Sequence, residues 1–217
     1  MEFHTLILFV IAALSINLIP GPDVIYIVTN TMKGKMKSGM KASLGLGVGY
    51  LIHTLAAVLG LSALILSSAF LFSLIKYLGA IYLLYLGVTS LLNCYHNRSK
   101  ICLDNNNDDL FQDGKKKQEN IFKQGVIISV LNPKVAMFFL AFLPQFVNPS
   151  ALNATQELLT LGLLFSVLAT LCNLLYASLG SILFSSAKAQ KYSRALEGVS
   201  GTILIGLSAK IALSGNK

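Results

Sequence analysis

The sequence has few charged residues for its length. Asp, Glu, Lys and Arg make up 12% of the 217 residues, and 54% of the residues are hydrophobic. A soluble domain carries about 25% charged residues. So few charges cannot cover the surface of a soluble protein of this size. The composition therefore argues against a cytosolic enzyme, a disordered chain and a nucleic-acid-binding protein.

Several other features are missing as well. Cys94, Cys102 and Cys172 are too few for the disulfide framework of a secreted domain. The N-terminus lacks the basic region and the small-residue cleavage site of a signal peptide, so its apolar run is interpreted as a retained transmembrane helix. There is no nucleotide-binding loop, which argues against ATP as the direct energy source. No cofactor is predicted.

Long apolar runs are what the sequence does contain. A spanning helix needs about 20 apolar residues, and the nearly uncharged stretch 42–92 is so long that it must turn, which we expect near Leu66–Ser73. The predicted fold is an all-α integral membrane protein, a single transmembrane domain over 1–217, with one long polar loop at about 94–123. Its six transmembrane helices are expected at about 3–32, 42–66, 73–92, 122–147, 158–184 and 195–213.

The basic residues predict the orientation of these helices. Thirteen of the 17 Lys and Arg residues fall in the first, third and fifth loops between the predicted helices. Cytoplasmic loops carry an excess of Lys and Arg. Both termini are therefore expected outside the cell. Six helices also divide into three plus three, and an odd number per repeat forces the inverted arrangement of many transporters.

A helix-breaking motif, Pro20-Gly21-Pro22-Asp23, lies inside the first apolar run. Two prolines and a glycine within four residues interrupt a helix. Broken backbone at membrane depth is tolerated where protein buries it or where it lines a wet cavity. Asp23 would lie in the first turn of a new half-helix, either on an ion or substrate path or only as a complement to the helix dipole.

A second break is predicted at Asn132-Pro133-Lys134 in the fourth apolar run. Asn is a good N-cap and Pro a good first helical residue. Asp23 and Lys134 are each about ten residues from a basic loop, so they should lie at similar depth. They either form a permanent ion pair or bind the two charged ends of a zwitterion. Asp23 is expected to be the only carboxylate within the spans.

These motifs together resemble the LysE/RhtB-type amino-acid exporters, and the resemblance covers essentially the whole chain. It rests on Pro20-Gly21-Pro22-Asp23, on Gly45, Gly47 and Gly49 followed by His53, on Asn132-Pro133-Lys134, and on Phe138-Phe139 and Leu143-Pro144-Gln145-Phe146. The resemblance implies a carrier in the bacterial inner membrane that exports amino acids or close derivatives, driven by the proton gradient. The residue after Pro-Gly-Pro varies in such families, and the Asn- and Lys-rich loop belongs to no known pattern.

Other residues within the spans are weaker candidates. His53 either relays protons or is a neutral histidine bonded to a neighbouring helix. Gly45 and Gly49 form a GxxxG pattern, which predicts close helix packing in a membrane. The amides Asn17, Asn30, Gln145 and Asn173 either join helices or contact substrate. Cys94, His96, Cys102 and Asp104 form a poor metal site, so no metal is predicted.

The main prediction is thus a secondary transporter, an antiporter that is not an enzyme, with an amino acid and protons as partners in a lipid bilayer. An exporter of a metal or other inorganic ion on the same bundle is the alternative, although metal transport favours more carboxylate, His or thiolate ligands within the spans. A non-transport assembly or sensor protein also stays open, as does a homo-oligomer.

Overall fold

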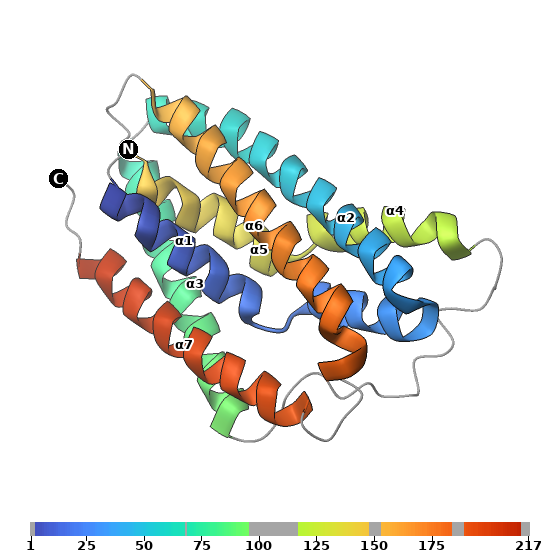
Figure 1. Ribbon diagram of the computed structural model, residues 1–217. Coiled ribbons are helices and arrows are strands. Elements are labelled where there is room, and N and C mark those ends of the chain that lie inside the picture. Colours follow the sequence, from blue (N-terminus) through green and yellow to red (C-terminus); the bar gives the residue numbers. More distant parts are fainter. Residues whose placement is uncertain (1–2, 68, 96–116, 148–152, 184–188, 214–217) are drawn as a thin grey trace.

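The computed structural model describes residues 3–67, 69–95, 117–147, 153–183 and 189–213, and all regular structure in these ranges is helical (Figure 1). This confirms the predicted all-α fold class. The elements are α1 (Phe3–Leu18), α2 (Pro22–Ser67), α3 (Ala69–Tyr95), α4 (Lys117–Val130), α5 (Pro133–Met137), the π-helical turn η2 (Phe138–Phe142), the 3-10 turn η3 (Leu143–Phe146), α6 (Ala154–Leu183) and α7 (Ala189–Leu213).

Both helix breaks expected from the proline motifs are present. The axis bends by 55° between Phe3–Leu18 and Pro22–Met32, and by 46° between Asn120–Val130 and Pro133–Phe146. At each break a new helix starts with a proline as its first residue, Pro22 in α2 and Pro133 in α5. Pro is suited to this position because its missing N–H would have no partner within the helix.

The expected loop between the first and second spans is helical instead. α2 keeps helical hydrogen bonding from Pro22 to Ser67 but turns sharply near its N-terminal third (Figure 1). At this turn Gly39 lies against Thr31 so closely that a Cβ would not fit. Eight residues span about 12 Å along a straight helix, so this contact requires the chain to reverse. The prediction of a loop was wrong because Lys and Met are good helix formers.

Several other helices are longer than the predicted apolar runs. α3 extends to Tyr95, α4 begins at Lys117, α6 at Ala154 and α7 at Ala189. Hydropathy detects the part of a helix that is apolar, whereas helical hydrogen bonding continues into polar residues with good propensity. The predicted polar loop at 94–123 is therefore helical at its two ends, and residues 96–116 lie outside the described part of the chain.

The outer faces of the helices are apolar. Two described helices, Met36–Gly60 and Ala154–Leu179, are long and apolar enough to cross a membrane, and each bent pair could add one more span. Large apolar side chains point outward along α2, α3 and α6, among them Leu55, Leu59, Ile81, Val167 and Leu175. An extensive exposed apolar surface marks a surface that lipid or protein covers.

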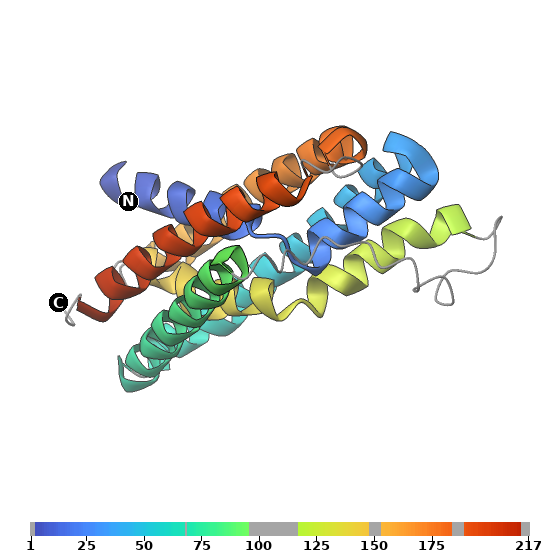
Figure 2. The same cartoon turned by 90° about the horizontal axis from the view of Figure 1, so that it is seen from below.

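Helices that are distant in sequence pack together. α2 lies along both α6 and α4, and α3 lies along α7, as the two views show (Figures 1 and 2). The α3–α7 crossing is tight, because the backbone oxygens of Gly87 and Gly201 each lie 2.9 Å from the position of a Cβ on the other glycine. Glycine permits such close approach of two backbones.

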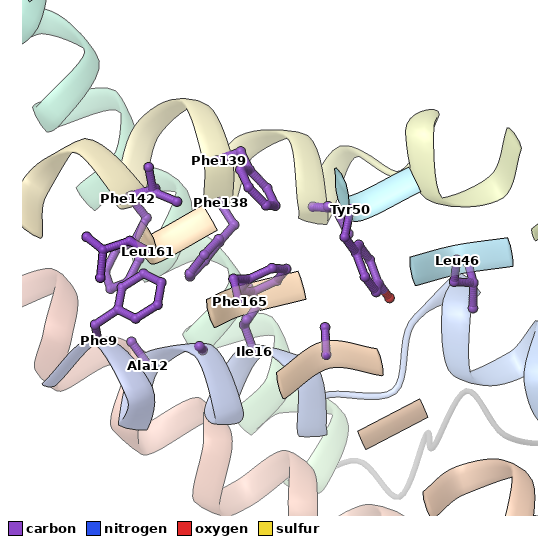
Figure 3. Close-up of a cluster of buried hydrophobic side chains, with 14 of the residues drawn as sticks. Phe9, Ala12, Ile16, Leu46, Tyr50, Phe138, Phe139, Phe142, Leu161 and Phe165 are labelled. Atoms are coloured by element: carbon purple, nitrogen blue, oxygen red, sulfur yellow. The ribbon is translucent and has the colours of Figure 1, made fainter. Parts of the chain in front are cut away.

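An aromatic cluster fills the space between α1, η2 and α6 (Figure 3). Phe138 stacks on Phe165 with ring centroids 4.3 Å apart, and Phe9 packs against Phe138 at 6.0 Å. Tyr50 lies beside this cluster, edge-on to Phe165 at 5.8 Å. Its ring is therefore held in the core, and its hydroxyl points away from the phenylalanines (Figure 3).

Candidate functional site

Asp23 lies in the first turn of α2, immediately after the first break, and is 3% exposed. Its two carboxylate oxygens accept hydrogen bonds from different parts of the chain. The Tyr50 hydroxyl donates to Oδ2 over 2.9 Å, and the Asn132 side-chain amide donates to Oδ1. The carboxylate thus joins the start of α2 to its own later turns and to the second break.

Asn132 forms the other half of this contact. It precedes α5 in extended conformation, and its Oδ1 accepts a hydrogen bond of 3.0 Å from the Lys134 backbone N–H. This is an N-cap, the role expected from the sequence. Its amide nitrogen therefore remains available to Asp23, and one side chain connects the two breaks.

Tyr50 and Asn173 extend the hydrogen-bonded chain to α6. The Asn173 amide donates to the Tyr50 hydroxyl over 2.9 Å. Tyr50 is fully buried and Asn173 is 2% exposed. Buried polar groups are costly unless they are hydrogen-bonded, so four helical segments must keep their relative positions for this network to form.

Lys134 lies at the first break although it belongs to the second. Its Nζ donates to the carbonyl oxygens of Ile16 and Ile19, at 3.2 and 3.1 Å, in and just beyond the last turn of α1. A Cβ on Gly21 would lie 3.2 Å from this Nζ. A cation at the C-terminal end of a helix is favourable because the freed carbonyls and the helix dipole attract it.

Asp23 and Lys134 interact electrostatically but form no direct ion pair in the part of the chain described. The structure therefore differs from the permanent ion pair considered above. Each charge is held by neutral groups, the carboxylate by an amide and a phenol, the ammonium by two carbonyls.

His53 faces α4. Its Nε2 lies 3.1 Å from the Ser129 carbonyl oxygen, and its ring stacks on Phe139 with centroids 5.6 Å apart. This geometry matches the histidine that bonds to a neighbouring helix, one of the two alternatives that the sequence left open. The Ser129 carbonyl belongs to the last turn of α4, so His53 satisfies a helix end next to the second break.

The remaining candidates lie outside the network. Asn30 and Gln145 each donate to a carbonyl four residues earlier, Tyr26 and Ala141 respectively, both at 2.8 Å. Gly45 and Gly49 lie against the backbone of α4, at Phe122 and Val126. Cys102, His96 and Asp104 lie outside the described residues, and the residues that are described contain no group of three or more potential metal ligands from His, Cys, Asp and Glu.

Sequence reasoning missed two buried residues. Tyr50 is not among the predicted site residues, although it lies on the same helix as His53 and a phenol within an apolar run needs a hydrogen-bond partner. Glu197 on α7 is 2% exposed and lies inside the span predicted at 195–213. Asp23 is therefore not the only carboxylate within the predicted spans. The backbone carbonyl of Glu197 accepts a 3.0 Å hydrogen bond from Ser90 on α3.

The helices have an apolar exterior, and two of the predicted spans are broken where they carry buried charged side chains. This is the arrangement of a membrane transporter. A family model described as "LysE type translocator" matches residues 14–215. The chain belongs to this family, and it is a multi-pass membrane protein.

Curated relatives resemble the chain over nearly its whole length. It is 33% identical to the membrane protein YrhP of Bacillus subtilis (strain 168) over 214 residues, which cover 97% of this chain and 100% of the relative. It is 27% identical over 212 residues to the leucine efflux proteins of Enterobacter sp. (strain 638) and Salmonella typhimurium (strain LT2), with 94% of this chain and 93% and 92% of those proteins covered. No solved structure matches the chain.

Proposed function

We propose that the protein exports amino acids or close derivatives across the bacterial inner membrane in exchange for protons. One observation carries this proposal. A buried carboxylate and a buried ammonium group come from two facing helix breaks and bind neutral groups instead of each other. An amino-acid zwitterion carries an ammonium group that can bind the carboxylate and a carboxylate that can bind the ammonium group.

The amino-acid substrate class is supported by the relatives. Two relatives that align with 94% of this chain are leucine efflux proteins. The amino-acid substrate class and the direction of transport are extended to this chain from that similarity, and the use of protons from the chemistry of the site.

In this mechanism the substrate's ammonium group binds Asp23 and its carboxylate binds the Lys134 side chain. Asn132 belongs to this proposed substrate site, and His53, Asn30 and Gln145 are proposed to lie along the pathway without carrying the proton. Binding requires the hydrogen bonds that now hold the two charges to be exchanged for bonds to substrate.

Asp23 also couples transport to protons in this proposal. Protonation from the outside removes the negative charge that holds the ammonium group, and the substrate leaves. Loss of the proton to the cytoplasm restores the binding state. A residue that binds either a proton or the substrate, but not both, is sufficient for exchange.

The proposed architecture is a single domain of six spans in two inverted three-helix repeats. The first and fourth spans each contain a proline break, and α3 pairs with α7 as the last helix of each half. The basic loops face the cytoplasm and both termini lie outside. Lys37 and Lys41, exposed at the turn of α2, should then be inaccessible from outside.

Transport into inverted membrane vesicles tests the function directly. Vesicles from overexpressing cells should accumulate a labelled amino acid when a proton gradient is imposed and not when it is collapsed. A panel of amino acids identifies the substrate. If no amino acid accumulates above the level of control vesicles, the proposal is wrong. Labelling of Lys37→Cys in intact cells by an impermeant thiol reagent would contradict the orientation.

A further inference from the structure

We infer that Tyr50 and Asn173 are positioning residues that, together with Asn132, hold both oxygens of Asp23 as hydrogen-bond acceptors, so that a proton on Asp23 requires one of these hydrogen bonds to change. This inference rests on the proposed role of Asp23 as the proton carrier. It assigns a task to Tyr50 on α2 and to Asn173 on α6.

The first fixed donor is Asn132. Its Oδ1 is occupied as the N-cap of α5, where it accepts from the Lys134 N–H. An amide side chain has one acceptor oxygen and one donor nitrogen. The nitrogen must therefore face Asp23 Oδ1, and it can only donate. Turning the amide around would leave the first turn of α5 without its cap.

The second fixed donor is the Tyr50 hydroxyl. A phenol has one proton to donate, and here the oxygen already accepts from the Asn173 amide. The proton therefore goes to Asp23 Oδ2, 2.9 Å away. Asn173 thus determines the direction of the Tyr50 hydrogen bond from a different helix, α6.

With both donors fixed, only an ionised Asp23 satisfies the network. A protonated carboxyl group carries its own O–H donor, which would meet the Asn132 amide on one side or the Tyr50 O–H on the other. Neither can accept without giving up its present partner. In a fully buried site a donor without an acceptor is unfavourable. Protonation therefore requires Asn173 to turn its amide, or Asn132 or Tyr50 to give up its present hydrogen bond.

Other titratable groups near the network do not replace these donors. Lys134 binds the end of α1, and the Tyr176 hydroxyl of α6 donates to the Leu18 carbonyl over 3.2 Å. Cys172 lies next to Asn173 and interacts electrostatically with Tyr50. His53, one turn further along α2, is directed at Ser129 of α4. The end of α1 presents the carbonyls of Ile16 and Ile19 to Lys134 and that of Leu18 to Tyr176.

The test measures protonation of Asp23 without using transport. Purified protein in lipid is titrated while infrared difference spectra are recorded, and the carboxyl band lost in Asp23→Asn is assigned to Asp23. This assignment separates it from the buried Glu197. The pH midpoint of the band is compared in the wild type, Tyr50→Phe and a matched control, Tyr26→Phe. Tyr26 is a buried tyrosine of the same helix that donates to Ile121 of α4.

Tyr50→Phe should raise the midpoint by about one to two pH units, the size expected for loss of one hydrogen bond to an ionised group. Loss of a donor favours the protonated form. Tyr26→Phe should leave the midpoint unchanged. An unchanged midpoint in Tyr50→Phe, or an equal shift in both variants, overturns the inference even if the protein exports amino acids.

Asn173→Leu keeps the test decisive if Tyr50→Phe does not fold. This variant leaves the Tyr50 donor in place but removes the group that directs it, so the midpoint should rise by less than in Tyr50→Phe. An unchanged pH midpoint in Asn173→Leu would contradict the inferred role of Asn173 in directing the Tyr50 hydrogen bond. Failure of vesicle transport with the expected midpoint shifts would refute the proposed function and leave this inference intact.

Discussion

The two helix breaks use the same backbone chemistry but opposite charges. Each has a proline at the first position of the new helix, followed by Asp23 in one case and Lys134 in the other. A carboxylate is stabilised at the N-terminus of a helix, whereas a lysine ammonium group is destabilised at this position. Lys134 instead crosses to the other break and binds the end of α1.

At each break, residues from elsewhere in the chain form hydrogen bonds with the carbonyl groups at the helix end. The end of α1 is satisfied by Lys134 and Tyr176, and the Ser129 carbonyl near the end of α4 is in contact with His53. Asn132 caps α5 and at the same time binds Asp23. A movement at one break therefore changes the hydrogen bonds of the other, so the two breaks are coupled.

The largest effect is expected from Asp23→Asn, which makes the first break neutral. Gradient-driven export should fall to the level of vesicles without the protein, because the variant cannot exchange a proton for an ammonium group. The side-chain oxygen of the amide can still accept from Asn132 or from Tyr50, so the protein should still insert into membranes, as an immunoblot measures, with one hydrogen bond of the network lost. Export at the wild-type rate with the same pH dependence would reduce Asp23 to a helix-terminus residue.

Lys134→Met tests the opposite charge. Two buried carbonyls lose their donor, so the free energy of unfolding should fall by about 2 kcal/mol or more, and the affinity for substrate by about tenfold to a hundredfold. Thermal unfolding in detergent and substrate binding measure the two losses. Lys123→Met, on the exposed face of α4, is the control and should change neither. Wild-type affinity in Lys134→Met would remove the lysine from the substrate site.

Two substitutions of Asn132 separate its two bonds. Asn132→Ala loses the cap, which costs about 1 kcal/mol, and the donor to Asp23. Asn132→Asp keeps a capping oxygen but places a second carboxylate beside Asp23, so its pH profile of transport should shift to higher pH, because like charges favour protonation. The Asp variant should therefore be the more shifted of the two. Identical pH profiles in both variants would argue against a contact with Asp23.

The smallest effect is expected from His53→Gln. Glutamine can still donate to the Ser129 carbonyl, so stability should change by about 1 kcal/mol or less. Export and its pH profile should stay close to wild type, because the histidine acts as a partner of a helix end. Loss of pH dependence in vesicle transport would instead identify His53 as a proton relay and make the two breaks less alike in function.

The sequence alone determined what depends on local chemistry. The proline motifs predicted both breaks, because a proline inside a helix removes a backbone hydrogen bond and its ring clashes with the preceding turn. Apolar runs predicted an all-helical membrane protein, and Asn132 was recognised as a cap from its position before Pro133. Loop and helix limits were less accurate, as at Lys33–Lys41 and Lys117, because polar residues with good helix propensity carry no boundary signal.

The partners of the buried charges were decided only by tertiary structure. Nothing local distinguishes Tyr50 from other tyrosines, or directs Lys134 to carbonyls 118 and 115 positions earlier in the chain. Such pairs form because a buried polar group must find a partner within reach, and reach depends on how α1, α2, α5 and α6 pack. The packing of distant helices, and not the motifs themselves, therefore determines which groups hold Asp23 and Lys134.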